Sequence, residues 1–203
     1  MTRIFAFCDM FFKHRDLQPV IDPKASVAPT AVVSGDVTIG AGCRILHGAV
    51  LTSEGGPIVL GSDCIVMENA VLRGTERHPL TIGSDILVGP RAYLSGCTVE
   101  DSVFIATGSS IFNGAVLRKG SEVRINGTVH LRTELPEGAT VPIGWVAVGR
   151  PASIFPPGAH EEIWAIQKML NFKGEVFGGL RMPDLPRVYS RFLAEHDADE
   201  ELD

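Results

Sequence analysis

The sequence predicts an all-β solenoid, in which short strands wind around a single apolar core. A branched aliphatic residue recurs at every sixth position from Val99 to Val141, eight times in succession. An α-helix needs an apolar period of 3.6 residues and a half-buried strand a period of 2, so neither explains a period of six. The chain also has 22 glycines for tight corners. These observations are typical of a parallel β-helix with three flat faces per turn.

The six-residue pattern begins at Val27 and breaks twice before it becomes regular. One break is the loop Ser-Glu-Gly-Gly-Pro after Leu51, and the other is the stretch RGTERHPLT between Leu72 and Ile82. Three hexads make one turn, so both loops follow the second hexad of consecutive turns. We therefore expect about six to seven turns, with both loops at one corner, one above the other, as the wall of a site.

The solenoid is predicted to occupy residues 21–155. Residues 1–20 form a lead-in whose aromatic side chains are expected to cap the open apolar end of the first turn, because terminal repeats need a cover. These aromatic residues are Phe5, Phe7, Phe11 and Phe12.

The chain after the solenoid is predicted to be helical. Residues 156–195 form an appendage in which apolar residues at helical spacing predict a helix over 159–170. A second, shorter helix is expected over 185–193. The first helix is expected to lie along the solenoid or on a neighbouring subunit. Residues 196–203 are acidic and are expected to be disordered.

Composition argues against several classes of partner. The net charge is −6 and no Lys/Arg run is present, so we expect neither nucleic acid nor an anionic membrane as a partner. No run of 18 apolar residues predicts a transmembrane span. The first residues lack the basic and apolar regions of a signal peptide, so a cytoplasmic protein is expected.

The four cysteines, at positions 8, 43, 64 and 97, contain no CxxC pair. They are too few for a secreted disulfide scaffold and lack the spacing of a zinc site. We expect buried, reduced thiols.

Several stretches are shared with a known family: SVAPTAVVSGDVTIGAG, GAVL followed by GGPIVLG, PLTIGSDILVG and LSGCTVEDSVFIATGS. Over about residues 20–155 the chain resembles the hexapeptide-repeat superfamily, and within it the γ-class carbonic anhydrases. The resemblance implies a left-handed parallel β-helix of hexapeptide repeats, followed by the C-terminal α-helix. It also implies a homotrimer with its pocket at the junction between subunits.

The resemblance further implies which residues stand at the family's three zinc-binding histidines. These positions are Arg73, Pro90 and Ser95. Arginine is a cation, proline has no side-chain ligand atom, and a neutral serine hydroxyl is a poor ligand for a catalytic zinc. We therefore expect no zinc and no hydration of carbon dioxide at this place.

Stacking of the hexads suggests what replaces the metal. His47 is expected to lie over Glu68 as an acid–base pair, with Arg73 nearby to bind a carboxylate or phosphoryl group of a small anionic molecule. An ordinary salt-bridge ladder on the surface explains the same residues. Also expected at this pocket are Glu54, Ser95 and, from the adjoining chain, Arg91 and Tyr93.

Two further interpretations remain open. His78, in the loop sequence ERHP, resembles the loop histidine with which some hexapeptide acyltransferases deprotonate their acceptor, and GPRAYL resembles part of their ligand strip. Under this alternative the cofactor is acetyl-CoA or another acyl-CoA. The other interpretation is a non-catalytic trimeric scaffold.

Overall fold

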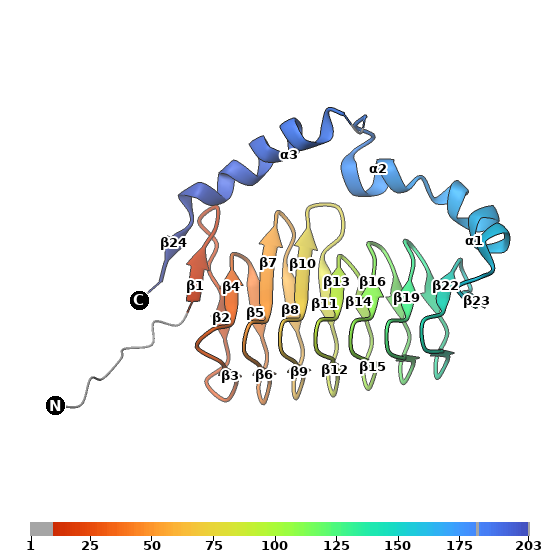
Figure 1. Cartoon of the computed structure of the whole chain (residues 1–203). Helices are drawn as coiled ribbons and strands as arrows, with labels where there is room; N and C mark the ends of the chain where they lie inside the picture. Colours follow the sequence, from red (N-terminus) through yellow and green to blue (C-terminus); the bar gives the residue numbers. More distant parts are fainter. Residues whose placement is uncertain (1–9, 182, 203) are drawn as a thin grey trace.

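The computed structural model describes residues 10–181 and 183–202 and confirms the predicted β-solenoid (Figure 1). Strands stack in three sheets of ten, seven and seven members, which gives about eight turns where six to seven were expected. The additional winding comes from both ends of the chain, where residues outside the clear hexads continue the coil.

The ten-stranded sheet carries the candidate site and is called the site face below. Its strands follow one another in the order β23 (Ser153–Phe155), β22 (Val146–Val148), β19 (Thr128–Val129), β16 (Ser110–Ile111), β13 (Tyr93–Ser95), β10 (Val71–Thr75), β7 (Val50–Glu54), β4 (Val32–Ser34), β1 (Met10–Lys13) and β24 (Glu200–Glu201).

The other two sheets each contain seven parallel strands. The second face is built from β2 (Val20–Ile21), β5 (Val37–Ile39), β8 (Ile58–Leu60), β11 (Leu80–Ile82), β14 (Thr98–Val99), β17 (Val116–Leu117) and β20 (Glu134–Leu135). The third face is built from β3 (Ser26–Val27), β6 (Arg44–Ile45), β9 (Ile65–Val66), β12 (Leu87–Val88), β15 (Phe104–Ile105), β18 (Glu122–Val123) and β21 (Thr140–Val141).

The register places the same aliphatic position of each hexad inside every turn. Leu72 pairs with Leu51 on one side and Leu94 on the other, and all three are fully buried. Burying a side chain of this size contributes about 1.5–3 kcal/mol. Because a slip by one residue would turn each strand's aliphatic outward, the register is strongly specified.

The lead-in is part of the solenoid. Strand β1 pairs in parallel with β4, and β2 pairs in parallel with β5. Phe11 lies opposite Val33 and packs against the core, as expected of a residue at the end of the solenoid. Phe12, also proposed as a cap, lies opposite Ser34 and lines a groove beside the strap, the C-terminal segment described next. The other two proposed capping residues, Phe5 and Phe7, and also Cys8, lie outside the described residues.

The C-terminal segment, residues 156–202 and called the strap below, crosses back from the last turn to the first (Figure 1). The two predicted helices appear as α1 (His160–Gln167), extended by a 3₁₀ turn at Lys168–Leu170, and α3 (Leu185–Leu193). Helix α2 (Phe172–Phe177) was not predicted. No helix in the described part of the chain is long and apolar enough to cross a bilayer.

The acidic tail, for which disorder was expected from composition, forms a short helix and a strand. A 3₁₀ helix at Ala194–Ala198 leads into β24, which pairs antiparallel with β1. The edge strand β1 offers unpaired backbone groups, and the tail satisfies them.

The two loops stack at one corner, between the site face and the second face, as predicted. Gly74 lies opposite Ser53, and Gly55 bridges to Thr75. The backbones approach so closely that a Cβ at Gly56 would lie 2.1 Å from the Thr75 carbonyl oxygen. Larger residues at this position would separate the loops.

Cys43, Cys64 and Cys97 are free and buried, as predicted. Burial raises the pKa of Cys64 to about 12 and also raises that of Cys97. Since the thiolate is the reactive form, the thiols of Cys64 and Cys97 act as inert packing groups.

A matched pair of leucines tests the core. Leu117 is fully buried in β17, whereas Leu17 is 49% exposed. We expect Leu117→Ala to lower the free energy of unfolding by about 2–5 kcal/mol because it leaves a cavity, and Leu17→Ala to change it by less than about 0.5 kcal/mol. Urea unfolding followed by circular dichroism measures both, and equal losses would contradict the predicted interior.

Candidate functional site

The strap is attached to the site face by side-chain contacts along its length. Gln167 contacts His130, which lies just after β19, and Glu175 contacts His78 in the second loop. Tyr189 then contacts Arg73 on β10. Successive residues of the strap therefore contact progressively earlier turns of the solenoid. The strap also covers the corner where the two loops emerge.

The centre of the site is a cluster around Arg73, called the Arg73 cluster. The guanidinium of Arg73 forms an ion pair with Glu54 at the end of β7. It also donates to the hydroxyl of Tyr189 at 2.8 Å and to that of Tyr93 at 3.4 Å. The cluster thus joins three neighbouring strands to helix α3.

Arg73 carries its full charge at this place. Burial lowers its pKa, but the hydrogen bond and ion pair with Glu54, helped by Tyr189, outweigh burial and raise the pKa above the ordinary value. Three-quarters of the Arg73 side chain is covered. Its Nε atom is buried and has no hydrogen-bond partner among the described residues. A buried guanidinium donor of this kind favours an acceptor.

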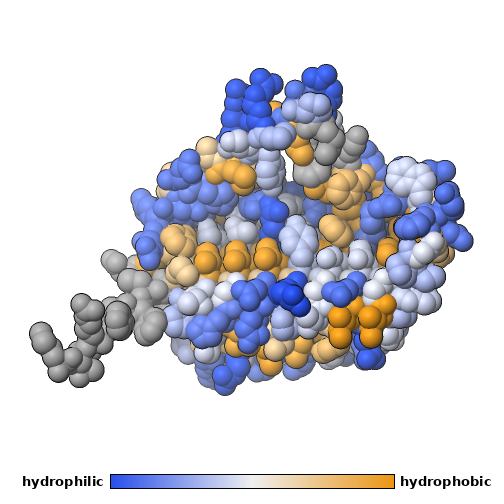
Figure 2. Space-filling model, viewed as in Figure 1, coloured by the Kyte–Doolittle hydropathy of each residue, from blue (hydrophilic) through white to orange (hydrophobic). Residues whose placement is uncertain are grey.

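A cavity of about 280 Å³ lies beside the cluster, between the loops and the strap. It is partly apolar, and the space-filling view shows apolar residues across the solenoid face below the strap (Figure 2). Its volume lies just below the range of about 300–1,000 Å³ that is usual for small-molecule sites. Its polar lining comes from Glu54, Thr75, Glu76, Arg77, Asn113, Glu175 and Tyr189, and its apolar lining includes Leu180, Leu185, Val188 and Phe192.

His78 lies at the loop corner in a tight turn closed by two backbone hydrogen bonds to Thr75. Its Nε2 atom lies 3.2 Å from a carboxylate oxygen of Glu175, whose other oxygen pairs with Arg132. The ring extends past Gly96 on the next turn and packs over Gly114, two turns away. The His78 side chain is 18% exposed. It is therefore largely buried and held by the Glu175 carboxylate, although it belongs to a loop.

The expected contact between His47 and Glu68 does not form within the chain. Their backbones do stack, because Asn69 donates to the His47 carbonyl oxygen and Arg91 donates to that of Glu68. The His47 ring instead contacts the hydroxyl of Thr30 on the preceding turn, at 2.8 Å. Backbone stacking places His47 and Glu68 on adjacent turns, but it does not determine the direction in which each side chain points.

The other predicted site residues divide between the two edges of the site face. Ser95 is buried beside Arg73 in register. Tyr93, which was expected to reach the pocket from the adjoining chain, instead contacts Arg73 of its own chain. Pro90 and Arg91 lie in the turn that precedes β13, on the side where His47 and Glu68 also lie. One chain therefore brings Glu54, Arg73, Tyr93 and Ser95 together and keeps Arg91, His47 and Glu68 apart from them.

Sequence reasoning missed the strap residues Glu175 and Tyr189. Helix α3, which carries Tyr189, was predicted, but no contact was predicted for its side chains. Nothing local showed that the Tyr189 hydroxyl reaches a residue 116 positions away.

Comparison with known proteins supports the resemblance. No protein-family model matches the chain. Gamma carbonic anhydrase 1, mitochondrial, from Arabidopsis thaliana is 33% identical over 169 residues, which are 77% of this chain and 59% of the relative. Gamma carbonic anhydrase 2, mitochondrial, from the same plant is 33% identical over 73% of this chain and 53% of the relative. The chain thus spans little more than half the length of these relatives.

A solved structure has the same fold. A hexapeptide transferase family protein from Anaplasma phagocytophilum matches with a TM-score of 0.52 and 24% identity, over 85% of this chain and 99% of that chain. At this identity the match concerns the fold alone.

Two tyrosines on one guanidinium test how the strap is held. Tyr189→Phe removes the 2.8 Å bond from the strap, whereas Tyr93→Phe removes the 3.4 Å bond from within the solenoid. A hydrogen bond to a charged group contributes about 1.5–3 kcal/mol, so we expect hydrogen exchange of the α3 amides to accelerate about tenfold or more in Tyr189→Phe only. Equal acceleration in both variants would contradict this arrangement.

Proposed function

Because the chain is a hexapeptide-repeat protein with homologues among the gamma carbonic anhydrases, we propose that it uses this scaffold to bind a small anionic molecule without zinc. The observation that carries the proposal is the charged guanidinium of Arg73, which stands where the resemblance places the first zinc ligand. An arginine side chain and a zinc ion both carry positive charge, so Arg73 would bind an anion where zinc does so in the resembled family.

The donor set at this place does not fit a catalytic zinc. Arg73 and Ser95 lie side by side in the sheet, and neither supplies the imidazole that such sites use. Pro90 has no side-chain donor. The fixed positive charge of Arg73 also repels a divalent cation. Hydration of carbon dioxide through a zinc-bound hydroxide is therefore excluded from the proposal.

The geometry around Arg73 favours an anion with a carboxylate or phosphoryl group. The Nε donor has no partner in the described residues, and Arg77 adds a second cation on the cavity wall. A guanidinium binds such groups with two parallel hydrogen bonds. Glu54 already neutralises the Nη2 side of the guanidinium, so the ligand competes with it or binds at Nε.

The proposal includes a homotrimer, because the resemblance places this pocket at a subunit junction. Residues at the edge of the site face opposite the loops, where His47, Glu68 and Arg91 lie, would then approach the Arg73 cluster from the neighbouring subunit. Of the residues in the turn before β13, Arg91 would add positive charge to the pocket.

One observation favours a second candidate, acyl transfer from an acyl-CoA. The Nε2 atom of His78 contacts the carboxylate of Glu175, and a carboxylate that orients a histidine is a common arrangement for a general base. The His78 imidazole would accept a proton from the acceptor's hydroxyl or amine as its oxygen or nitrogen attacks the thioester carbonyl. As the tetrahedral adduct collapses and its C–S bond breaks, the His78 imidazolium would return that proton to the sulfur, and coenzyme A would leave as the thiol.

Rates of carbon dioxide hydration test the zinc-free part of the proposal. We expect the purified protein, incubated with excess zinc, to leave the rate at the uncatalysed value in a stopped-flow indicator assay. Catalysis that needs Arg73 or Ser95 would overturn it.

Calorimetry tests the ligand. We expect succinate or inorganic phosphate to bind the wild-type protein and to lose about 10-fold or more in affinity in Arg73→Gln, because a charge-assisted bidentate pair is removed. Arg44→Gln, an exposed arginine on the third face, is the control. Binding of acetyl-CoA that depends on His78 would favour acyl transfer instead, and binding of none of these probes would favour a scaffold.

A further inference from the structure

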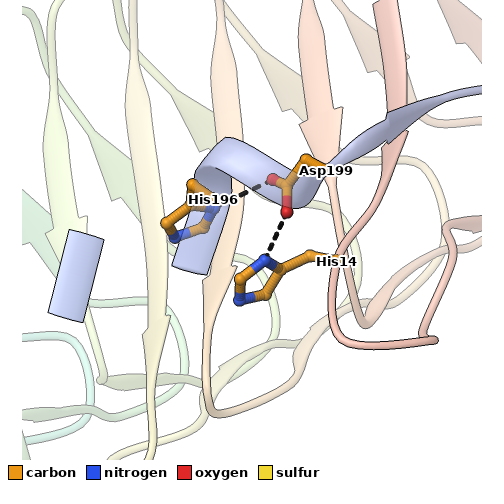
Figure 3. A group of neighbouring side chains, drawn as sticks. All are labelled: His14, His196 and Asp199. Carbon is orange, nitrogen blue, oxygen red and sulfur yellow. Dashed lines mark hydrogen bonds and ion pairs between the residues drawn. The ribbon is translucent and has the colours of Figure 1, made fainter. Parts of the chain in front are cut away.

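Three potential metal ligands from the two ends of the chain meet away from the Arg73 cluster (Figure 3). His14 follows β1, His196 lies in the 3₁₀ helix of the strap, and Asp199 ends that helix. One ligand atom from each lies within 4.8 Å of those from the other two. They form the one such group of histidine, cysteine and acidic residues among the residues that the structure describes.

The fold brings these residues together for identifiable reasons. Strand β24 pairs antiparallel with β1 so that Lys13 lies opposite Glu200, and the next step of that register places Asp199 beside His14. A 3₁₀ helix has three residues per turn, so positions three apart point the same way. His196 and Asp199 are three apart and therefore share one side of the helix.

The donor atoms converge in a way that suits a metal ion. Nδ1 of His14 lies 2.6 Å from one carboxylate oxygen of Asp199, and Nδ1 of His196 lies 2.9 Å from the other. The two rings stack with their centroids 4.0 Å apart and their planes 13° apart. In Figure 3 both rings lie around the same carboxylate. Two histidines and one carboxylate are a common ligand set for zinc and other first-row divalent metals.

The three side chains are largely buried, and a further hydrogen bond holds the carboxylate in place. The His14 side chain is 4% exposed, that of Asp199 is 13% exposed and that of His196 is 25% exposed. The hydroxyl of Ser34 donates to Asp199 at 3.3 Å, as partners of metal-binding carboxylates do. A groove bounded by Thr52, Glu54 and Leu193 reaches His196 and Asp199 and leaves space for a water ligand.

We propose that His14, His196 and Asp199 bind one divalent transition metal ion, with zinc as the fitting member, and that the ion fastens the strap to the first turn. Metal–ligand bonds of about 2.0–2.2 Å place neighbouring ligand atoms about 3.3 Å apart, so shifts of about 1 Å admit the ion. Each imidazole coordinates through Nδ1 and carries its hydrogen on Nε2. The nearby charges of Arg15 and Glu195 are paired with each other.

This site is independent of the function proposed above, because none of its ligands belongs to the Arg73 cluster. Zinc bound here would not catalyse hydration at Arg73, and failure of either proposal leaves the other standing.

Calorimetry with zinc chloride on protein stripped with EDTA tests the proposal. We expect one zinc ion per chain in the wild type and in the control His160→Ala, which changes an exposed histidine of α1. We expect no saturable binding in His14→Ala or Asp199→Asn. Asp199→Asn keeps the size of the side chain and an acceptor oxygen, so it separates loss of a ligand from loss of folding, and circular dichroism verifies that each variant folds.

Thermal unfolding supplies a second readout. Zinc at 100 times its dissociation constant is expected to raise the midpoint of the wild-type protein by about 5–10 °C. The same addition should not shift Asp199→Asn. Absence of saturable zinc binding in the wild type, or unchanged binding in either His14→Ala or Asp199→Asn, would overturn the proposal.

Discussion

Parallel backbone hydrogen bonding between stacked turns is the constraint on which the rest of this molecule depends. It makes every residue the neighbour of its counterpart one turn away, as when Arg73 lies between Thr52 and Ser95. Two breaks in the repeat at equivalent positions must therefore emerge at one corner. The candidate site exists because both loops stack there, and the strap covers the place where they do.

Features that follow from the hexad register or from local patterns could be predicted from the sequence. Side-chain contacts between residues far apart in the chain could not. The aliphatic columns, the loop corner and helices α1 and α3 follow from local patterns, and all are present. The contact of His47 with Thr30 in place of Glu68 did not follow, because a side chain at a turn has a choice of direction. Tyr189 and Asp199 act over more than 100 positions, which no local pattern records.

The strap gives the two ends of the chain a shared structural role. A solenoid of this kind buries its core turn by turn, and its end turns need a cover. Here β24 covers the edge of β1, while α1 to α3 cover the site face along its length. The strap residues Glu175 and Tyr189 also supply polar groups to the cavity. Opening of the strap would therefore change both the stability of the first turn and the chemistry of the cavity.

Diffraction from zinc-soaked crystals, recorded at the zinc absorption edge, tests the central claim most directly. The proposed function has the Arg73 guanidinium in the place that a metal takes in the resembled family. We expect no anomalous peak near Arg73 and Ser95, in one chain or between subunits. A zinc peak bonded at that place would contradict the claim, whereas a peak among His14, His196 and Asp199 is compatible with it.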